Sequence, residues 1–476
     1  MPHDELPFPL SDVSNGEWCP RPPNEKQRAV KKLLLEEAEK RAKRLGMSRR
    51  QFLRTAAGTA TAYMVMNRVH GLDQTGDAAV LPVTKEECDD PAAAREKFKA
   101  DYFIMDVQLH HVDTVRYPNV AIAELLRFRD TAPPGSSDEE ILYLVGQMNM
   151  IKEVWVDSET AVGVISGIPN GFPLPVDTMA ATRDLVNQYA GSRRALSQAM
   201  CDPRSAPTNS TSIAQLEHQV KDLGATGLKC YTGASVPTPW FLDDEEVAYP
   251  MLEEASRLGI RVINVHKGFP SILGPMAPPY VRSRDLPKVS KDWPRLSFVA
   301  YHSGYGLDAA SAGVTGIDEF LSEVNKVPNS HNLYAEIGSS FAVAFTQGPQ
   351  QAAHLIGALL RDLGPRHVVW GTDSIWWGSP QWQIEAFKTL QIPADMQEQF
   401  SYPALTERAR RSIFGRNAAR LYRIPIHERR CEIAADQITK LRRELGAPEK
   451  TRSYMAYGPR TRREFLNLLA REQVSG

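Results

Sequence analysis

The stretch that decides the fold is Tyr102-Phe-Ile-Met-Asp-Val-Gln-Leu-His-His111, an apolar run that ends in polar side chains able to bind a metal. Tyr102 to Met105 has the length and composition of a buried parallel strand. Asp106, Gln108 and His110 then alternate, and alternation in a strand places them on one face. In a barrel of parallel strands, ligands for a catalytic metal lie at the carboxyl ends of the strands. On its own, the stretch favours a structural histidine at an ordinary strand end.

Length and charge describe a globular protein. The chain has 476 residues, enough for one large barrel with appendages or for several smaller domains. Its formal net charge of −1 gives no case for binding nucleic acid or an anionic membrane. The five cysteines show neither Cys-x-x-Cys pairs nor regular spacing, which argues against a zinc ribbon or a disulfide scaffold. The sequence contains no apolar run that approaches the roughly 18 to 20 residues of a membrane-spanning helix.

The N-terminal region differs in character from the rest of the chain. Residues 26–54 contain eleven Lys or Arg against three Glu, and residues 26–45 carry a helical pattern. Ser48-Arg-Arg-Gln-Phe-Leu-Arg54 is followed by the weakly apolar run from Thr55 to Met66. Paired arginines, Phe-Leu shortly after them and a short apolar segment are features of a twin-arginine export signal. We therefore expect export to the periplasm through the twin-arginine machinery. The alternative is a cytoplasmic protein with a surface helix that begins with basic residues.

A second copy of the RRxFL pattern shows that the context carries this prediction. Thr461-Arg-Arg-Glu-Phe-Leu466 contains the same five-residue pattern near the C-terminus. Asn467 to Arg471 follows it without an apolar segment, so we expect an amphipathic helix there. The region before residue 48 is long for a signal, and no Ala-x-Ala site follows, which leaves the cleavage position open.

From Tyr102 onward, strand-like runs alternate with helical patterns. This alternation is typical of a parallel α/β fold, and eight strands favour a closed barrel over a doubly wound sheet. We expect an α/β protein with a (β/α)8 TIM barrel, a helical N-terminal extension and a C-terminal helical tail. The expected strands are 102–105, 161–166, 194–200, 226–231, 260–266, 296–302, 333–337 and 367–370. The expected units are a basic extension over 1–47, a twin-arginine segment over 48–80, the barrel over 81–425 and the tail over 426–476.

Residues suited to metal binding recur at the ends of four of these strands. His110 follows the first strand, His266 ends the fifth, His302 ends the sixth, and Asp373 lies just past the eighth. Closure of the barrel brings the first and eighth strands side by side. Imidazole and carboxylate groups are suitable ligands for zinc or another divalent metal. A single histidine at a strand end is usually structural, but four such residues at corresponding ends predict a metal site.

The ordered set of motifs resembles the amidohydrolase superfamily, specifically the branch that includes aminocarboxymuconate-semialdehyde decarboxylase and resorcylate decarboxylase. The resemblance runs from about Tyr102 to Ile424. It implies one bound divalent metal, with zinc expected and manganese as the alternative. The segment from Ile413 to Tyr422 is similar to the Asn-Ala-x-Arg-Leu helix that closes these barrels. The strand-end motifs that carry the resemblance are Asp106-Val-Gln-Leu-His110, His266, His302-Ser-Gly304 and Gly371-Thr-Asp373.

Gln108 departs from the family pattern, which has His or Glu at this position. Its amide oxygen can bind a metal, but it is neutral and a poorer donor than imidazole or carboxylate. The expected metal site therefore has three strong ligands, His110, His266 and Asp373, with Gln108 as a weak fourth. The neighbouring His111 is directed away from Gln108 and His110 by the strand pleat, and we expect a hydrogen-bonded surface or loop residue.

The expected site implies catalytic roles. A bound metal would activate water and polarise the reacting carbonyl, with Asp373 as general base. We expect His302 to donate a proton or to stabilise developing negative charge. Trp376 and Trp377 are expected either to form an aromatic wall for a planar substrate or to pack their loop onto the barrel rim. The further substrate-binding candidates at strand ends are Lys229, Tyr231, Glu336 and Lys267. A second interpretation of Lys229 is that its side chain is carboxylated and bridges two metals.

The resulting functional expectation is a metal-dependent hydrolase that acts on an amide, ester or lactone bond of a small, carboxylated or aromatic substrate. Non-oxidative, metal-dependent decarboxylation is the alternative. A non-catalytic barrel used for binding or assembly is a third possibility, which Gln108 keeps open. The expected partners are the small-molecule substrate, the twin-arginine machinery and further copies of the chain in a homo-oligomer.

Overall fold

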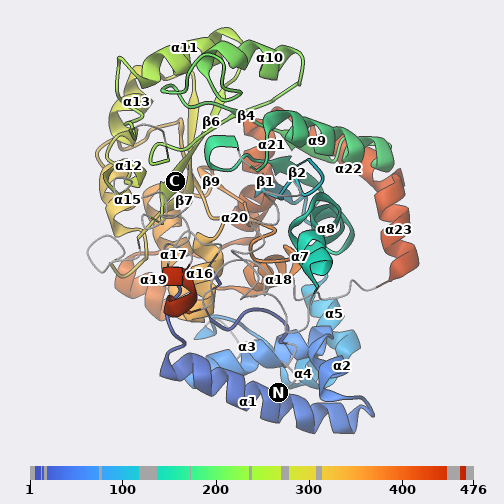
Figure 1. Ribbon diagram of the computed structural model, residues 1–476. Helices are drawn as coiled ribbons and strands as arrows, with labels where there is room; N and C mark the ends of the chain where they lie inside the picture. The colour runs from blue at the N-terminus through green and yellow to red at the C-terminus, as the bar shows by residue number, and fades with distance from the viewer. Residues whose placement is uncertain are drawn as a thin grey trace.

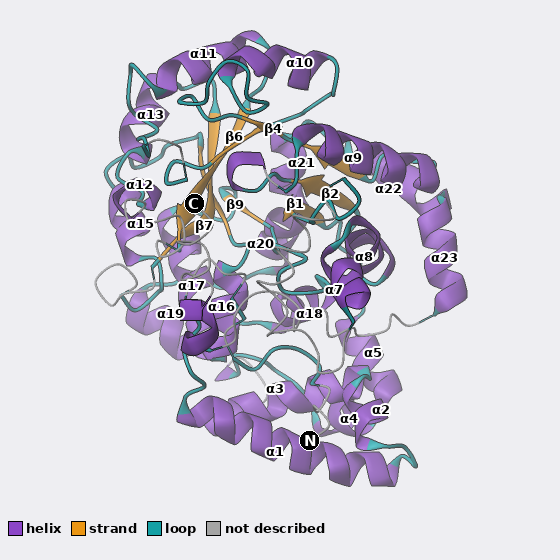
Figure 2. Ribbon diagram, viewed as in Figure 1, coloured by secondary structure: helices purple, strands orange, loops and turns teal. Residues whose placement is uncertain are grey.

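The protein is described by a computed structural model in which parallel strands lie at the centre and helices surround them (Figure 1, Figure 2). The structure describes residues 6–11, 13–14, 19–73, 78–116, 137–171, 173–234, 238–269, 278–306, 313–446 and 461–467. All eight expected strands are present, and the first begins at Met105, where we expected it to end. The strands are β1 (Met105–Leu109), β2 (Val162–Ile165), β3 (Ala195–Ser197), β4 (Ala199–Met200), β5 (Leu228–Cys230), β6 (Val262–Gly268), β7 (Ser297–Tyr305), β8 (Leu333–Glu336) and β9 (Val368–Val369).

Backbone hydrogen bonds close these strands into a barrel. Parallel pairing runs from β1 to β3 and from β4 to β9. Strands β3 and β4 are two parts of one expected strand, separated by Gln198, whose N–H donates to Ile165 of β2. The last strand returns to the first, so the expected (β/α)8 TIM barrel is confirmed. The joining hydrogen bonds run from Val107 N to Trp370 O (3.1 Å), from Asp373 N to Gln108 O (3.1 Å) and from His110 N to Ser374 O (2.7 Å).

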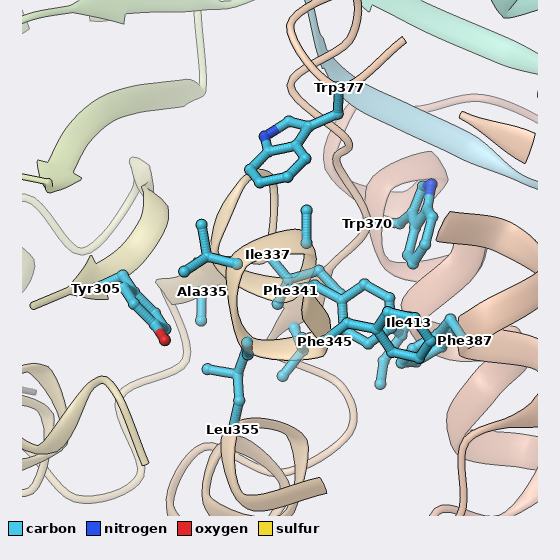
Figure 3. Close-up of a cluster of buried hydrophobic side chains, with 14 of the residues drawn as sticks. Tyr305, Ala335, Ile337, Phe341, Phe345, Leu355, Trp370, Trp377, Phe387 and Ile413 are labelled. Carbon is cyan, nitrogen blue, oxygen red and sulfur yellow. The ribbon is translucent and has the colours of Figure 1, made fainter. Parts of the chain in front are cut away.

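Helices in the connections cover the outside of the barrel. Phe103, Met105 and Val107 pack inside it against valines of β2, β6, β7 and β9. A second apolar layer lies between strands and helices, where the ring centroid of Phe341 lies 6.0 Å from that of Phe345 and 6.1 Å from that of Trp370 (Figure 3). The connecting helices are α7 (Asp138–Val145), α8 (Gln147–Ile151), α9 (Val176–Ala190), α10 (Leu216–Lys221), α11 (Ala248–Arg257), α12 (Pro278–Val281), α13 (Leu286–Asp292), α15 (Asp318–Val324), α16 (Ser340–Gln347) and α17 (Pro349–Asp362).

The helices after β9 close the amino-terminal end of the barrel. Asn417, the first residue of α21 (Asn417–Leu421), donates through Nδ2 to the carbonyls of Pro365 (2.8 Å) and Val368 (2.7 Å). The tail is fixed to β3 by Arg194, which forms a two-pronged ion pair with Asp436, and both side chains are buried. The remaining helices here are α18 (Gln381–Thr389), α19 (Ala394–Phe400), α20 (Glu407–Arg411), α22 (Ile426–Ala435) and α23 (Gln437–Leu445).

The helices before the barrel form an N-terminal layer, a name used here for residues 25–98. They lie side by side along the lower edge of Figure 1, in blue. Gln27 Nε2 of this layer donates to the carbonyl of Thr346 in α16 (2.7 Å), which attaches the layer to the barrel. The helices are α1 (Glu25–Arg44), α2 (Arg49–Leu53), α3 (Ala56–His70), α4 (Lys85–Asp89) and α5 (Pro91–Phe98).

Helix α3 contains the segment expected to be the apolar part of an export signal. Most of its side chains are buried, and Tyr63 is fully buried. The ring centroid of Tyr63 lies 5.6 Å from that of Phe8 and 5.9 Å from those of Phe98 and Phe345. The segment is therefore an interior helix of the folded protein, unlike the surface helix of the alternative interpretation. Export itself and the limits of the four expected units stay predictions.

The remaining terminal expectations concern short segments. Residues 462–467 are helical, as expected for the second RRxFL copy, and the residues after 467 lie outside the described part of the chain. Within the described ranges, the helices lack the combination of length and apolar character needed to cross a membrane.

Candidate active site

Four polar side chains from three strands meet at the carboxyl end of the barrel. Gln108 and His110 come from the end of β1, His302 from β7, and Asp373 from the segment after β9. Each of them is no more than 2% exposed. We refer to these four residues as the Gln108 cluster.

A bulge in β1 brings Gln108 into this cluster. Because Met105 and Val107 face the barrel interior, strict alternation would direct Gln108 outward. The pairing with β2 shifts register between Asp106 and Leu109, and such a bulge redirects the side chains that follow it. The Asp106 carboxylate holds this bend by accepting the N–H of Gln108 (3.0 Å) and the hydroxyl of Thr372. The expectation that Asp106 shares a face with Gln108 and His110 was therefore wrong.

The side chains of the cluster converge on one atom, Gln108 Nε2. It lies 2.9 Å from Asp373 Oδ1, 3.3 Å from His110 Nε2 and 3.4 Å from His302 Nε2. His110 Nε2 is also 3.1 Å from Asp373 Oδ1. An amide nitrogen is a donor only, so three potential acceptor atoms surround a single NH2 group.

Backbone carbonyls fix the tautomers of both histidines. His110 Nδ1 is 2.7 Å from the carbonyl of Ser166, and His302 Nδ1 is 2.8 Å from that of Gly338. Each Nδ1 must therefore carry a proton, and in the neutral ring Nε2 is left as an acceptor. Burial lowers the pKa of His302 to about 4 despite the nearby Asp373, so His302 is neutral at pH 7. The neutral ring of His302 therefore directs an Nε2 lone pair towards Gln108.

Asp373 is the anionic member of the cluster. Burial would raise its pKa, but its contact with His110, the nearby His302 and a hydrogen bond from Ser339 lower it below the ordinary value. Ser339 Oγ in turn accepts the indole N–H of Trp377 at 2.8 Å. The carboxylate is therefore ionised and held in one orientation from both sides.

The backbone around the cluster is strained. His302, Ser303 and Asp373 have φ values of 66°, 51° and 58°, in the left-handed region that residues other than glycine seldom adopt. Such conformations cost of order 1–3 kcal/mol each and persist only where the surroundings enforce them. Strain at both His302 and Asp373 indicates that the fold holds these two side chains for a purpose other than stability.

Glu336 is one of the groups that enforce this geometry. Its Oε2 accepts the N–H of His302 at 2.9 Å, and its Oε1 accepts the N–H of Gly338. A Cβ at Gly371 would come within 1.8 Å of Glu336 Oε1, so glycine is needed there to make room for the carboxylate. Burial raises the pKa of Glu336 to about 8, in spite of the backbone hydrogen bond from His302. We expected Glu336 to contact substrate, but its oxygens are occupied by backbone amides.

His266 lies next to the cluster without joining it. Its ring centroid is 4.7 Å from that of His302 and 5.3 Å from that of Tyr231. Neither ring nitrogen makes a hydrogen bond within the described residues, although the side chain is buried. Lys229 is buried beside it, with Nζ 3.8 Å from the ring centroid of Tyr301 and 4.5 Å from that of Tyr231. Lys229 lowers the pKa of both His266 and His302, after the larger effect of burial.

The two tryptophans after Asp373 differ in position. Trp377 is fully buried, and Figure 3 shows it above the apolar cluster that contains Ile337 and Phe341. Trp376 is 8% exposed, and its ring stacks on that of His110 with centroids 6.1 Å apart. Trp377 therefore has the packing role of the two expected roles. Trp376 lies next to the cluster, where an aromatic wall was expected.

The donor atoms suit a divalent cation on one condition. Ligand atoms bound tetrahedrally to one zinc ion at about 2.0–2.2 Å lie about 3.3–3.6 Å from each other, and His110 Nε2 and Asp373 Oδ1 are slightly closer, at 3.1 Å. Gln108 Oε1 is buried without a hydrogen-bond partner among the described residues. As they stand, however, no three His, Cys, Asp or Glu side chains in the described ranges could hold a metal ion. The residues fit a cation if the amide of Gln108 turns its oxygen inward.

The structure bears on two further expectations. His111 is directed away from the cluster and is a hydrogen-bonded loop residue, as expected, and it is also buried, with Nε2 3.0 Å from Thr182 Oγ1 in α9. A buried ion pair to Asp285 at 2.7 Å occupies Lys267, which we had considered for substrate contact. Asp106, which the sequence singled out in the motif of the first strand, supports the cluster from behind. Ser339 also supports it and was missed as a site residue. Ser339 lies three residues after the end of β8, which is the only sequence signal that it offers.

The chain matches one family model over more than half of its length. A family model described as Amidohydrolase matches residues 169–424, which is more than half of the chain but does not include β1. No curated protein matches the chain significantly.

Comparison with solved structures gives matches at low sequence identity. One is 2,6-dihydroxybenzoate decarboxylase from Rhizobium, at 17% identity, a TM-score of 0.42, and coverage of 68% of this chain and 99% of that one. A second is 4-oxalomesaconate hydratase from Rhodopseudomonas palustris, at 19% identity, a TM-score of 0.40, and coverage of 69% and 98%. A third is a dihydroxybenzoic acid decarboxylase from Polaromonas with bound manganese, at 16% identity, a TM-score of 0.40, and coverage of 68% and 98%. Identities this low carry no information about the reaction of this chain.

Proposed function

This chain belongs to the amidohydrolase family, and we propose that it hydrolyses an amide, ester or lactone bond of a small, carboxylated or aromatic substrate. The observation that carries the proposal is the Gln108 cluster, in which an ionised carboxylate and the Nε2 atoms of two histidines meet at the carboxyl end of the barrel. In a (β/α)8 barrel this end is where catalytic residues are found.

Asp373 is the residue suited to take a proton from an attacking water. Its lowered pKa keeps it ionised at neutral pH, and Ser339 holds one of its oxygens while the other faces the cluster. His302 has a different role from the one expected. Because Nδ1–H is used by Gly338 and the ring is neutral, Nε2 accepts a proton or a hydrogen bond and does not donate one at neutral pH.

A divalent metal, zinc or manganese, would be held by His110, Asp373 and the amide oxygen of Gln108, and would supply Lewis-acid polarisation and a more acidic bound water. The orphaned nitrogens of His266 make it the further candidate ligand. The chain's own contribution is to hold these donors with the strained backbone at His302 and Asp373.

The surroundings support a planar or anionic substrate. Trp376 stacks beside His110, and an aromatic ring in this place suits contact with a flat group. Lys229 contributes a buried positive charge close enough to lower the pKa of His266 and His302, which favours an anionic group nearby. Tyr231 lies beside Lys229 and His266 and completes the candidate substrate contacts.

A substrate panel tests the proposal. Purified protein with added Mn²⁺ or Zn²⁺ would be incubated with lactones, esters, amides and aromatic carboxylates, while acid production and CO2 release are followed together. Hydrolysis produces acid without CO2, and the Asp373→Asn variant should lose it. Release of CO2 would identify the chain as a decarboxylase, and ligand binding without turnover would identify a binding protein. Either of these results would overturn the proposal.

A further inference from the structure

We propose that the side-chain amide of Gln108 is a two-position gate for the cation of this site. In one position its N–H groups hold the cluster together without a metal. In the other, reached by a half turn of the amide, Oε1 becomes a ligand. This inference rests on the proposed function, because it concerns the cation used there.

The first position follows from the surroundings of Gln108 Nε2. Asp373 Oδ1, His110 Nε2 and His302 Nε2 all lie within 3.4 Å of this atom. The shortest of these contacts is a hydrogen bond of 2.9 Å from Gln108 Nε2 to Asp373 Oδ1. A buried carboxylate oxygen needs a donor or a cation beside it, and in this position the amide of Gln108 supplies the donor.

The second position follows from the opposite end of the same amide. Gln108 Oε1 has no hydrogen-bond partner within the described residues, although it is buried. It lies against Gly338, where a Cβ would come within 2.7 Å of it, so the glycine leaves room at this end. The oxygen and nitrogen of an amide have nearly the same size, and a half turn exchanges them without moving the backbone.

The two positions exclude each other electrostatically. After the half turn, Oε1 would face Asp373 Oδ1 at a distance similar to the present 2.9 Å. Two oxygens at this separation repel unless a cation binds both. The orientation of the amide and the occupancy of the site are therefore one equilibrium, and the cation must displace the N–H contacts before it binds.

This gate predicts how the metal-free protein behaves. The wild-type chain should fold and remain stable after chelator treatment, and should bind a divalent cation weakly. A carboxylate at position 108 would remove the N–H donors and add a charged ligand. Such a variant should be less stable without a cation and should bind it more tightly.

The experiment compares Gln108→Glu with wild type and with Gln383→Glu. Gln383 is a matched control because it is also buried and donates through Nε2 to the carbonyl of Thr372 (3.1 Å), yet lies outside the cluster. Its Oε1, like that of Gln108, has no hydrogen-bond partner among the residues that the structure describes. Mn²⁺ binding to chelator-treated protein would be measured by calorimetry and melting temperature. We expect Gln108→Glu to bind Mn²⁺ at least tenfold more tightly than wild type, and to gain more melting temperature on binding. Gln383→Glu should not gain affinity.

Other outcomes overturn the inference. If Gln108→Glu binds Mn²⁺ no more tightly than wild type, the amide does not control the cation. If Gln108→Glu fails to fold, Gln108→Met decides, since it removes both donor and ligand at similar length. That variant should bind Mn²⁺ at least tenfold more weakly than wild type, and unchanged binding would overturn the gate. These readouts are independent of turnover, so the gate can fail while hydrolysis persists, or hold while the proposed reaction fails.

Discussion

The carboxyl end of the barrel, called the mouth below, and the N-terminal layer both contain buried side chains, but these side chains are of opposite kinds. The Gln108 cluster at the mouth consists of polar side chains, whose nitrogen and oxygen atoms converge on one amide. The interior of the N-terminal layer consists mainly of apolar side chains, with Tyr63 packed among three aromatic rings. The mouth keeps charges and lone pairs away from water, which costs stability, whereas the layer gains stability from apolar burial.

The backbone shows the same difference. Of the eight non-glycine residues with positive φ in the described ranges, five lie near the mouth: Phe269, His302, Ser303, Ser339 and Asp373. In the N-terminal layer, by contrast, α1, α2 and α4 each begin with a complete capping box. Local sequence and structure agree in the layer and conflict at the mouth. Such conflicts are found at functional sites.

The largest expected effect is on activity, from Asp373→Asn. Loss of a general base typically lowers kcat about 10²- to 10⁴-fold. Stability should change little, because asparagine tolerates the left-handed φ of 58° at this position better than most residues. The measurements are kcat on a substrate found in the panel and urea unfolding of the same preparation. A variant that keeps its kcat would remove Asp373 from the mechanism and weaken the contrast between the two regions.

Tyr63→Ala in α3 should do the opposite, and lower stability strongly with little change in activity. Truncation of a buried aromatic side chain costs about 3–5 kcal/mol of unfolding free energy, and Tyr63 is fully buried. The KM and kcat of the folded fraction should stay close to wild type, since the residue lies in the N-terminal layer.

Tyr63→Phe is the matched control for this change. The Tyr63 hydroxyl has no hydrogen-bond partner among the described residues, so its removal should leave stability unchanged or slightly higher. Equal losses of stability in Tyr63→Ala and Tyr63→Phe would mean that the hydroxyl, and not ring packing, anchors α3.

Much of the fold was predictable because its signals are local. A buried strand needs an apolar run of the right length, and such runs from 161–166 to 367–370 gave all later strands. The register of β1 was not predictable in the same way. Its bulge depends on the Asp106 carboxylate meeting Thr372, a contact between segments 266 residues apart in sequence. The burial of α3 is likewise set by Phe345 of a distant helix, and a weakly apolar segment does not reveal its partner.

The candidate site was predictable in position but not in detail. Strand-end placement indicated His110, His302 and Asp373, because parallel strands carry their functional residues at corresponding ends. The separate position of His266 was not predictable from the same pattern. The tautomers of His110 and His302 depend on carbonyls of Ser166 and Gly338, which any residue type would supply. The contacts of the Gln108 amide nitrogen required three-dimensional distances that no spacing in the sequence contains.

A smaller effect is expected from acid acting on the N-terminal layer through His70. Burial, helped by the charge of Lys26, lowers the pKa of His70 in the folded state to about 4. The unfolded chain, with a histidine pKa near about 6.5, therefore binds the proton first as the pH falls. The contribution of His70 to stability should be complete above about pH 6.5 and should decline from there towards pH 4. Urea unfolding between pH 7 and pH 4.5 should show a shallower decline for His70→Gln than for wild type, whereas parallel declines would contradict the assignment.

The smallest effect on stability is expected from Arg49→Lys combined with Arg50→Lys. This double variant tests whether the two arginines determine the location of the protein without affecting its fold. Both residues lie in the first turn of α2, where lysine keeps the charge, so the unfolding free energy should change by less than about 0.5 kcal/mol. If the twin-arginine signal is used, the double variant should nevertheless stay in the cytoplasm, folded and active. The same change at Arg462 and Arg463 is the control and should not alter location.

Because α3 packs through Tyr63 into the folded protein, the exported wild type should keep residues 56–70, which N-terminal sequencing of the periplasmic fraction would show. A double variant distributed like wild type would mean that the N-terminal layer carries no export signal and serves the fold, oligomerisation or docking instead.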